Sequence, residues 1–576
     1  MGCVRATGSE RDTGLTAMPS STDFDAIIVG SGFGGSVCAF RLASAGARVL
    51  VLERGRRWSP ATFPRKPDDP WIWDVRQPEK HHGWFDFRIF PNMTVVQGAG
   101  VGGGSLVYAN ISVNAKKETF NSGWPPEIRF DELQDYYEAV RVTMNVGPVP
   151  TNQWPERTKL LHDAANAAGY GNRFRRLDLA VTFDDTWNYG LPNPHDPQRS
   201  KKAPNAFGVE QGTCVHLGNC DIGCDVNARN TLDLNYLAGA EQHHAEVRPL
   251  HLVRTVAPVS GGYEVRYDEI SDSGTLSPGR ATARIVVIAA GSLGSTELLL
   301  QSRTAGLLPD ISSRLGQGWS SNGDFLTPAL HFFRTVNPTR GPTITGAIDL
   351  LDGEFNGKEI FVEDGGLPDV ARAWLQDLVT HDAADPKEAR VIASILPLLS
   401  GGQFLEHVMP WFAQARDAAD GRLSLKNGQL WLDWDVSASR ETIDAVAAVH
   451  RKLAFLTEGM PLTPVTWTIG HDLITPHPLG GCNMGRSSAD GVVDHLGQVF
   501  NYPNLYVADG AIVPKAIGLN PSKTIAALAE RIAKGLVEKL NAPRGPIRRG
   551  RRKPDKVGSQ PGKRRQRSTP RRRMRT

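Results

Sequence analysis

The sequence predicts an α/β fold, α+β overall, with one parallel sheet and a second sheet that is mixed or antiparallel. Residues 23–30 read Asp-Phe-Asp-Ala-Ile-Ile-Val-Gly, a β-branched run typical of a buried parallel strand. A helix-compatible stretch and a second apolar run at 47–52 follow it. Residues 284–300 repeat the order of strand, glycine turn and helix start. Residues 421–434 instead alternate on both sides of an Asn-Gly pair, which predicts an antiparallel hairpin.

The first strand runs directly into a glycine-rich turn, Gly30-Ser-Gly32-Phe-Gly34-Gly35. Gly30 permits a tight turn, Gly32 lets a pyrophosphate approach the backbone, and Gly35 lets the following helix lie close to the strand. That helix presents unpaired N–H groups and a partial positive charge to phosphates. Glu53, at the end of the second strand, can accept hydrogen bonds from a ribose hydroxyl and would repel a 2′-phosphate. The whole unit predicts dinucleotide binding.

Two further glycine-rich segments extend this prediction. Residues 98–108 read Gly-Ala-Gly-Val-Gly-Gly-Gly-Ser-Leu-Val-Tyr, and glycines at this density let backbone N–H groups line a flat or phosphorylated ligand. Residues 284–300 place a strand before a glycine turn at Gly291 and a helix start. This pattern suits the far side of a nucleotide-binding sheet.

The C-terminal part carries two polar motifs before a strongly periodic helix. The first motif begins at His477 and reads His-Pro-Leu-Gly-Gly-Cys, and the second spans 504–521. Residues 522–540 repeat apolar side chains with the helical period. Asn520 is a good N-cap for this helix, and Pro521 suits its first position. The helix start is a second positive pole, which would favour an anion formed beside it.

Composition and charge exclude several classes of protein. Apolar residues make up 40% of the 576 residues and charged residues 22%, which excludes a disordered chain, a collagen and a disulfide-stapled mini-protein. The formal charge is +4, but residues 544–576 alone carry +14 and the remaining residues carry −10. The mildly acidic body gives no reason to expect specific nucleic-acid binding.

Both ends are predicted to lie outside the folded body. Residues 1–22 lack the apolar core of a signal peptide, which predicts a loose leader and a cytoplasmic protein. Residues 544–576 hold almost no apolar side chains, so we expect a disordered basic tail. The tail is either a solvated extension or an electrostatic tether that gives peripheral contact with anionic lipid, or contact with nucleic acid.

Three of the six cysteines, Cys214, Cys220 and Cys224, lie close together in the sequence. Their spacing approaches that of an iron–sulfur run, but Leu217 stands where the second cysteine belongs, so a four-thiolate cluster cannot form locally. A structural loop is the favoured interpretation, and a zinc site that uses His216 is the alternative. We therefore expect no metal.

These segments together resemble the glucose–methanol–choline (GMC) oxidoreductases, the FAD-dependent alcohol oxidases and dehydrogenases. Within that family the chain is most similar to the cholesterol oxidases of the signal-less, actinobacterial-type branch. Secreted cholesterol oxidases carry Asn where Tyr108 stands and Tyr where Pro476 stands. The resemblance is carried by 30–53, 98–115, 290–300, 319–323, 477–481 and 504–531.

The resemblance implies an FAD site and an active site at matching positions. His477 matches the family's active-site histidine, and Asn520 matches the asparagine that partners it. Glu363 matches the substrate-domain acid of the cholesterol oxidases. The residues implied to hold FAD are Gly30, Gly32, Phe33, Gly34, Gly35, Glu53, Gly103, Gly104, Tyr108, Ala109, Ile111, Val253, Ala290, Gly291, Asp509, Gly510, Asn520 and Pro521.

The implied reaction oxidises the 3β-hydroxyl of a sterol to a ketone, with the hydride passing to flavin N5 and then to oxygen or a quinone-type acceptor. An imidazole titrates near neutral pH, which suits His477 to taking or orienting the hydroxyl proton. Asn520 would donate to the developing oxygen, and Glu363 would move a proton from C4 to C6 and so turn a 5-ene into a 4-ene. The alternatives are a GMC dehydrogenase of another apolar alcohol with a quinone or carrier acceptor and, outside enzymes, a basic-tailed interaction protein with a vestigial flavin fold.

The resemblance also implies two interleaved domains. A discontinuous, Rossmann-like FAD-binding domain is expected from 23–60, 90–120, 205–310 and 475–541. A substrate-binding domain, whose sheet roofs the flavin, is expected from 61–89, 121–204 and 311–474. Aromatic and aliphatic residues at 391–412 are expected to wall an apolar pocket.

Overall fold

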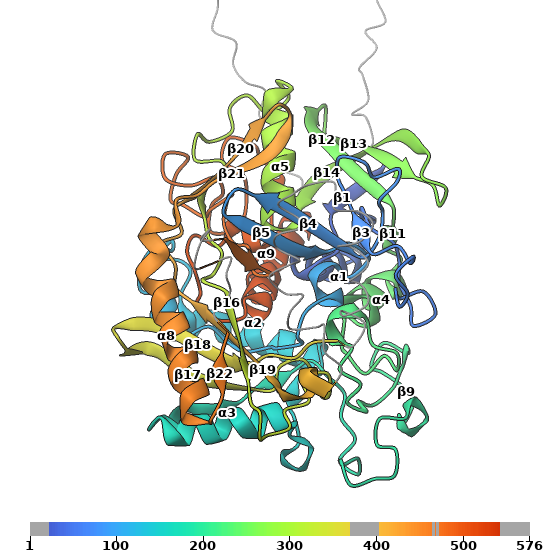
Figure 1. Cartoon of the computed structure of the whole chain (residues 1–576). Coiled ribbons are helices and arrows are strands. Elements are labelled where there is room, and N and C mark those ends of the chain that lie inside the picture. The colour runs from blue at the N-terminus through green and yellow to red at the C-terminus, as the bar shows by residue number, and fades with distance from the viewer. Residues whose placement is uncertain (1–21, 369–402, 463–466, 468–471, 542–576) are drawn as a thin grey trace, which may run out of the picture. The chain divides into compact units, whose positions relative to one another are not determined.

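A seven-stranded sheet forms the core of the computed structural model, which describes residues 22–368, 403–462, 467 and 472–541. The strand order is β11-β2-β1-β14-β13-β12, and β24 also pairs with β14 (Figure 1). β1 pairs in parallel with β2 and β14, as predicted from the two apolar runs that form β1 and β2. The strands are β1 (Phe24–Val29), β2 (Val49–Leu52), β11 (Glu246–Arg248), β12 (His251–Val259), β13 (Gly262–Ile270), β14 (Leu276–Ile288) and β24 (Leu505–Val507).

The long strand β14 joins two differently built halves of this sheet. Its first part pairs antiparallel with β13, from Leu276 opposite Ile270 to Ala283 opposite Tyr263. Its last part pairs in parallel with β1 on one side and with β24 on the other. In this parallel part β2, β24 and the last four residues of β1 and of β14 are buried, which explains why these segments are continuous apolar runs.

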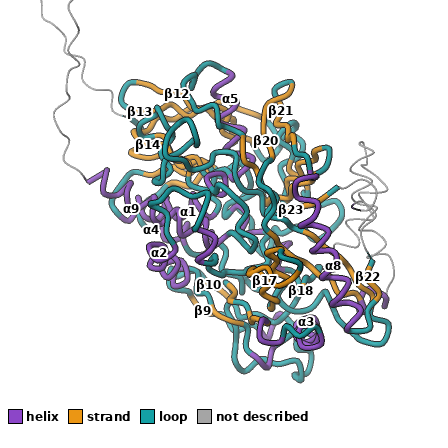
Figure 2. Tube along the Cα trace, turned by 90° about the vertical axis from the view of Figure 1, so that its left-hand side faces the viewer, coloured by secondary structure: helices purple, strands orange, loops and turns teal. Residues whose placement is uncertain are grey.

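Helices α1 (Phe33–Ser44), α4 (Tyr236–Gln242) and α9 (Ser522–Asn541) lie together beside this sheet (Figure 2). Glu530 of α9 joins them, because it accepts hydrogen bonds from Arg41 of α1 at 2.7 Å and from the Tyr236 hydroxyl of α4 at 2.8 Å. Helix α5 (Gly291–Thr304) packs on β12. The helices expected after the first glycine-rich turn, after Gly291 and at 522–540 are confirmed as α1, α5 and α9.

The second large sheet has six strands in the order β22-β16-β19-β18-β17-β7, and every pairing in it is antiparallel. Helix α8 (Arg440–Leu456) packs on β16, β18 and β19, and α3 (Glu156–Ala167) packs on β17 and β18. A further helix, α2, spans Phe130–Thr143. The strands are β7 (Phe174–Arg176), β16 (Phe325–Leu330), β17 (Gly346–Phe355), β18 (Lys358–Asp364), β19 (Val408–Ala415) and β22 (Met460–Pro461).

Smaller sheets complete the body. The predicted hairpin is confirmed as β20 and β21, and Asn427 and Gly428 both have positive φ, as a type I′ turn requires. One four-stranded sheet comprises β3 (Ile72–Trp73), β4 (Phe85–Phe90), β5 (Met93–Gly98) and β23 (Leu473–Thr475). The others comprise β15 (Gln317–Trp319), β20 (Gly421–Lys426) and β21 (Gln429–Asp433); β6 (Gly147–Pro148) and β8 (Asp178–Leu179); and β9 (Ala203–Pro204) and β10 (Glu210–Gln211).

The two large sheets draw on different segments of the chain. All strands of the seven-stranded sheet come from segments expected to bind FAD, and all strands of the six-stranded sheet come from segments expected to bind substrate. The sheet of β3, β4, β5 and β23 mixes the two sets. The domain boundaries themselves stay a prediction, because residues up to Leu540 form one compact unit.

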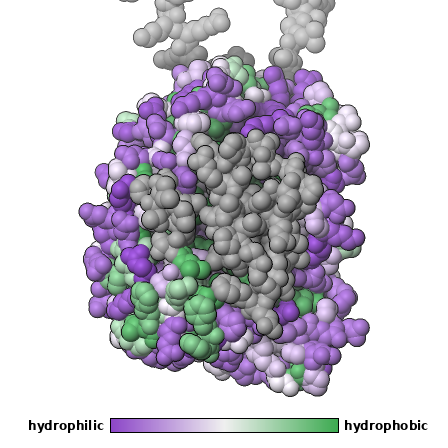
Figure 3. All heavy atoms as spheres, in the orientation of Figure 1, coloured by the Kyte–Doolittle hydropathy of each residue, from purple (hydrophilic) through white to green (hydrophobic). Residues whose placement is uncertain are grey.

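The visible surface carries one apolar group of side chains over α8 and β22 (Figure 3). Among the described residues, no helix is long and apolar enough to cross a membrane. The expected leader, the basic tail and residues 391–402 of the expected pocket wall lie outside the described residues. The exposed apolar residues near α8 and β22 are Phe332, Phe333, Phe455, Leu456 and Met460.

Candidate active site

A cavity of about 580 Å³ lies between the two large sheets. Gly30, at the end of β1, lines one wall, and Leu326 of β16 and Phe412 of β19 line the other. His477, Asn520 and every residue expected to hold FAD, except Gly35, line it. Glu363 is not among the lining residues.

The glycine-rich turn needs its glycines because the backbone packs against backbone there. Gly30 has φ +93°, and a Cβ on it would overlap the carbonyl oxygen of Ala289. A Cβ on Gly34 would overlap the carbonyl oxygen of Ala508, and one on Gly35 would overlap that of Gly30. These three glycines therefore bring β1, α1 and the end of β24 together.

Gly32 and Gly104 are different, because open space faces both. A Cβ on Gly32 would meet nothing closer than the Gly103 Cα at 4.0 Å, and one on Gly104 would meet nothing within 4 Å. Both residues line the cavity. This is the room that a phosphate or a flat ring needs to reach backbone N–H groups, so these residues fit a dinucleotide.

Glu53 is held at the cavity wall by groups of the protein. Its Oε2 accepts hydrogen bonds from the Ser31 N–H at 3.0 Å and the Ser31 hydroxyl at 2.7 Å. Its Oε1 accepts from the Gly55 N–H at 2.9 Å. A carboxylate oxygen accepts more than one hydrogen bond, so Glu53 keeps the capacity to accept a ribose hydroxyl.

Asp509 connects the last strand of the core sheet to the start of α5. It accepts hydrogen bonds from the N–H groups of Gly291 and Ala511, both at 2.8 Å, and from the Ser295 hydroxyl. Burial raises the pKa of Asp509 to about 6, and these hydrogen bonds oppose the shift. The carboxylate therefore fixes the glycine turn at the cavity wall.

Arg229, which the sequence analysis missed, supports the loop that carries Tyr108. Its guanidinium donates to the carbonyl oxygens of Ser105 at 2.6 Å and Leu106 at 2.9 Å, and to Asn110 Oδ1 at 2.7 Å. It also lies 5.3 Å from the centre of the Tyr108 ring. A buried arginine in a loop segment gave no signal in the sequence, because its acceptors lie more than a hundred residues away.

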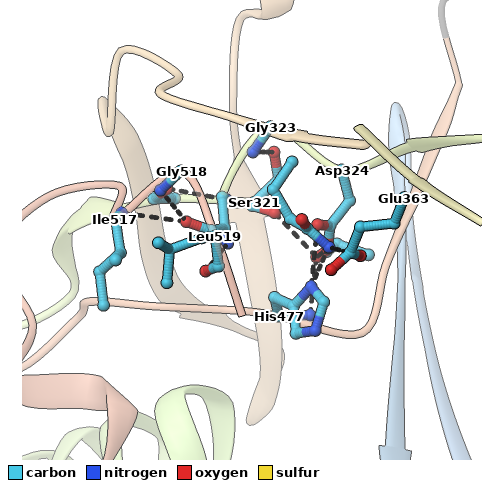
Figure 4. A network of polar contacts seen from close by, with 12 residues as sticks. Ser321, Gly323, Asp324, Glu363, His477, Ile517, Gly518 and Leu519 are labelled. Carbon is cyan, nitrogen blue, oxygen red and sulfur yellow. Dashed lines mark hydrogen bonds and ion pairs between the residues drawn. The ribbon is translucent and has the colours of Figure 1, made fainter. Parts of the chain in front are cut away.

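His477 contacts a second residue that the sequence analysis missed, Asp324 (Figure 4). The Nδ1 atom of His477 lies 2.9 Å from Asp324 Oδ1 and 3.0 Å from Oδ2. Thr475 supports both residues, because its hydroxyl donates to Asp324 at 2.5 Å and accepts the His477 N–H at 2.9 Å. The buried carboxylate keeps the proton on Nδ1, which leaves Nε2 as an acceptor.

The predicted N-cap role of Asn520 is wrong. Helix α9 begins at Ser522, and its first hydrogen bond runs from the Ile525 N–H to the carbonyl oxygen of Pro521. The buried Oδ1 of Asn520 has no hydrogen-bond partner within the part of the chain that the structure describes. The side chain is therefore not used to cap the helix, and it lines the cavity.

Asn322 holds the segment that leads to Asn520. Its Oδ1 accepts from the N–H groups of Ile517 at 3.0 Å and Gly518 at 2.9 Å, and its Nδ2 donates to the carbonyl oxygen of Leu519 at 3.0 Å (Figure 4). Asn322 itself has φ +58°, which Asn tolerates better than most residues. One side chain two residues before Asp324 thus positions Asn520 as well.

Glu363 lies on β18 next to the His477–Asp324 pair (Figure 4). Its Oε2 accepts a hydrogen bond from Gln414 Nε2 at 2.8 Å, and its Oε1 has no partner among the described residues. Burial raises the pKa of Glu363 to about 8, whereas the amides of Gln414 and Asn520 oppose the shift. The carboxyl is therefore protonated at neutral pH and in electrostatic contact with the cavity residue Asn520.

The cysteine segment has no metal-binding arrangement in the described ranges. Cys214, Cys220 and Cys224 are free thiols. His216 stacks on Trp187 with ring centres 4.0 Å apart, and its two ring nitrogens contact a tyrosine hydroxyl and a glutamine amide. Both nitrogens that could ligate zinc are thus already paired.

Comparisons with known proteins agree with this site. The family model described as GMC oxidoreductase matches residues 417–529, and that of an NAD(P)-binding Rossmann-like domain matches residues 28–77. The chain is 31% identical to the cholesterol oxidase of Acinetobacter baumannii, over 88% of this chain and 93% of that protein. It is 32% identical to the cholesterol oxidase of Mycobacterium tuberculosis, over 89% of this chain and 90% of that protein.

A solved structure shows the same fold. Pyridoxine 4-oxidase from Mesorbium loti is similar with a TM-score of 0.59 and 17% identity, over 89% of this chain and 98% of that one. The fold and the relatives define an FAD-dependent oxidoreductase that acts on CH–OH donors. The chain belongs to the GMC oxidoreductase family.

Proposed function

We propose that this enzyme oxidises the 3β-hydroxyl of a sterol to a ketone and then isomerises the 5-ene to the 4-ene. The observation that carries the proposal is the position of Glu363, a buried carboxyl with a raised pKa next to the catalytic histidine. Oxidation alone does not need this acid, whereas moving a proton between two ring carbons does. The cholesterol oxidases at 31% and 32% identity support a sterol as the substrate.

The proton of the substrate hydroxyl passes to His477. Asp324 holds the imidazole with Nδ1 protonated, so Nε2 accepts the proton at the cavity wall. The imidazolium that forms stays paired with the buried Asp324 carboxylate, which stabilises it. FAD, held by the glycine-rich wall, supplies the hydride acceptor for the carbon.

Asn520 contacts the substrate oxygen in this proposal. The single hydroxyl proton is directed at His477, so the side-chain N–H of Asn520, which lines the cavity, donates a hydrogen bond to the substrate oxygen. Asn322 fixes the backbone just before it, which keeps the amide in place. The substrate is thereby oriented before the reaction, which lowers the entropic part of the barrier.

Glu363 moves the second proton. Burial raises the pKa of Glu363 to about 8, so its carboxyl releases its proton to solvent as the pH approaches 8, and this deprotonated form is the base that accepts the C4 proton. Gln414 holds one oxygen, so the free Oε1 is the atom available for transfer. The proton then returns to C6, and the double bond moves into conjugation with the new ketone.

A panel of purified alcohols tests the proposal. The holoenzyme is incubated with sterols, bile-acid alcohols and long-chain alcohols, and ketone, aldehyde, 4-ene product and hydrogen peroxide are measured separately. Conversion of a 5-ene-3β-ol to a 4-ene-3-one is expected. Turnover of long-chain alcohols with no turnover of any sterol would refute the substrate class.

The same panel decides the electron acceptor. Tyr108 and Pro476, which differ from the residues of secreted cholesterol oxidases, both line the cavity, and this favours a second candidate, a dehydrogenase with a quinone or carrier acceptor. Peroxide in the amount of ketone identifies an oxidase. Ketone formed only when a quinone is added identifies the dehydrogenase.

The basic tail is proposed to give peripheral contact with anionic membranes. The observation behind this proposal is the charge of +14 on residues 544–576. Removal of these residues is expected to abolish sedimentation with anionic vesicles and to leave turnover of dispersed substrate unchanged. Equal sedimentation of both forms would refute the tether.

A further inference from the structure

Asp221 is a carboxylate on the cavity wall that the reaction above does not use. Three other carboxylates line the cavity, and each has close partners: Glu53 accepts from Ser31 and Gly55, Asp509 accepts from three donors, and Glu297 pairs with Arg88 at 3.2 Å. In the described part of the chain, Asp221 accepts only from the Thr343 hydroxyl, at 3.3 Å. One of its oxygens is therefore left for a ligand.

The backbone around Asp221 is held firmly, so the side chain has a defined position. It belongs to a short 3-10 turn, Cys220–Ile222. The Trp84 indole donates to the Asp221 carbonyl oxygen at 3.2 Å. Arg65 donates to the carbonyl oxygens of Ile222 at 2.8 Å and Gly223 at 3.0 Å. A recognition group supported in this way loses little entropy when it binds.

Asp221 lies on the substrate side of the cavity. Its partner Thr343 leads into the six-stranded sheet and also lines the cavity. Gly366, another lining residue, packs so close to the Thr343 carbonyl oxygen that an added Cβ would lie 2.8 Å from it. Gly366 follows Glu363 by three residues, a span of at most about 10 Å. A substrate at Glu363 therefore extends toward Asp221.

The charges near Asp221 select the kind of group that it binds. Burial raises the pKa of Asp221 to about 6, and the charges of Arg229 and Arg157 oppose that shift. Arg157 is fully buried and donates to the carbonyl oxygens of Pro342 at 2.6 Å and Thr343 at 3.2 Å. Because two arginines already act on its charge, Asp221 gains less from an ammonium group than an isolated carboxylate would. A neutral hydroxyl is the donor that fits.

We propose that Asp221 forms a second polar contact in the cavity, which binds a hydroxyl of the substrate remote from the hydroxyl that is oxidised. The enzyme then prefers a diol to the mono-alcohol of the same skeleton. This inference rests on the proposed function only in that the substrate is a largely apolar alcohol that spans the cavity.

Two matched pairs of alcohols test the inference with the holoenzyme. One pair is a 5-ene steroid 3β,17β-diol and its 17-deoxy 3β-ol, and the other is a long-chain α,ω-diol and the 1-alkanol of equal length. The diol is expected to have a kcat/KM about ten-fold higher or more, because a hydrogen bond to a charged group is gained. The symmetric α,ω-diol has two reactive ends, so its kcat/KM is divided by two before the comparison.

Substitutions test whether Asp221 causes the preference for the diol. Asp221→Leu is expected to remove the advantage of the diol or reverse it, and Asp221→Asn, which keeps an acceptor oxygen, is expected to retain part of it. Asp233→Asn is the matched control, because Asp233 is also buried near Arg229 but does not line the cavity. FAD content and circular dichroism identify any variant that has not folded.

The outcomes separate this inference from the proposed function. If only the alkanol pair is turned over, the sterol proposal fails and the diol preference is still measured. The dissociation constant of each alcohol for the anaerobically reduced holoenzyme, which cannot accept a hydride, gives the same comparison without turnover. Equal binding of diol and mono-alcohol, or a preference that Asp221→Leu leaves unchanged, would overturn the role of Asp221.

Discussion

The two walls of the cavity are built by different means. The wall at the glycine-rich turn is made of backbone, and its geometry depends on Gly30, Gly34 and Gly35, where no side chain has room. The opposite wall acts through side chains: His477 lines the cavity, and the buried side chains of Asp324 and Glu363 lie behind it. In the proposed reaction the first wall binds the nucleotide by shape and by backbone N–H groups, whereas the second moves protons.

The two walls are therefore sensitive to different kinds of substitution. An atom added to the backbone wall would overlap main-chain atoms of the neighbouring segment, so the two segments must move apart. A side-chain wall fails when a charge or a tautomer changes, although the fold survives. Substitutions in the first wall should therefore abolish folding or FAD binding, and substitutions in the second should alter rates at full FAD content.

The largest effect is expected for Gly34→Ala. Its Cβ would overlap the Ala508 carbonyl oxygen, so α1 and the end of β24 must move apart. We expect loss of bound FAD and a destabilisation of several kcal/mol, about the upper range for single substitutions. Thermal unfolding and the absorbance of released FAD measure both.

Gly46→Ala is the control for that substitution. Gly46 also has positive φ, +84°, but no atom lies within 4 Å of its added Cβ. It should cost about 1 kcal/mol from backbone strain alone. Similar losses in the two variants would show that steric overlap at the turn is not the cause.

The next effect is expected for His477→Gln, on the opposite wall. Removing the proton acceptor should lower kcat by about 10²- to 10⁴-fold. FAD content should stay at the wild-type level, because the residues expected to hold the nucleotide lie mainly on the backbone wall. Stopped-flow reduction of the flavin by substrate measures the loss, and an unchanged reduction rate would contradict the role of His477.

A smaller loss of activity is expected for Asp324→Asn, about 10²-fold in kcat, because the imidazole loses the carboxylate that keeps the proton on Nδ1. The pH profile of flavin reduction should shift with it. Asp417→Asn is a matched control, since Asp417 accepts from Ser320 and Ser321 in the same segment and does not contact His477. Its pH profile should not change.

The smallest effect on oxidation is expected for Glu363→Gln, which should spare ketone formation and abolish the 4-ene product. The variant also changes how stability depends on pH. Burial raises the pKa of Glu363 in the folded protein to about 8, whereas the unfolded chain releases this proton near the ordinary carboxyl pKa of 4.5. Wild type should therefore lose stability relative to the variant as pH rises from about 5 to 8. Parallel unfolding curves across this range would contradict the raised pKa.

The same contrast explains what could be predicted from the sequence. The turn from Gly30 to Gly35, with its strand, helix and Glu53, is a local pattern, so its structure followed from neighbouring residues. His477 was predicted from a family motif. Its partner Asp324 was not, although the acid directly follows a recognised Trp-Ser-Ser-Asn-Gly motif and precedes an apolar strand.

The remaining misses share a physical cause. Arg229 and Asp221 are polar residues in a loop-rich segment, and only the tertiary fold brings the cavity to them. Asn520 fits an N-cap by its position in the sequence, but the helix begins later and the side chain faces the cavity instead. In each case the role of the residue depends on contacts with residues distant in sequence, which a local sequence pattern does not reveal.

The way β14 joins the core sheet has a consequence for biosynthesis. Phe24 pairs with Ala283, and Val286 pairs with Leu505, so the sheet closes only when nearly the whole chain has been made. Contacts this distant in sequence form slowly, because long loops must be ordered first. FAD loading is therefore expected as a late event, after β24 and the start of α9 leave the ribosome. Chains truncated before Leu505 should contain β1 and α1 and yet retain no FAD on gel filtration, since the residues that complete the nucleotide wall are not yet present.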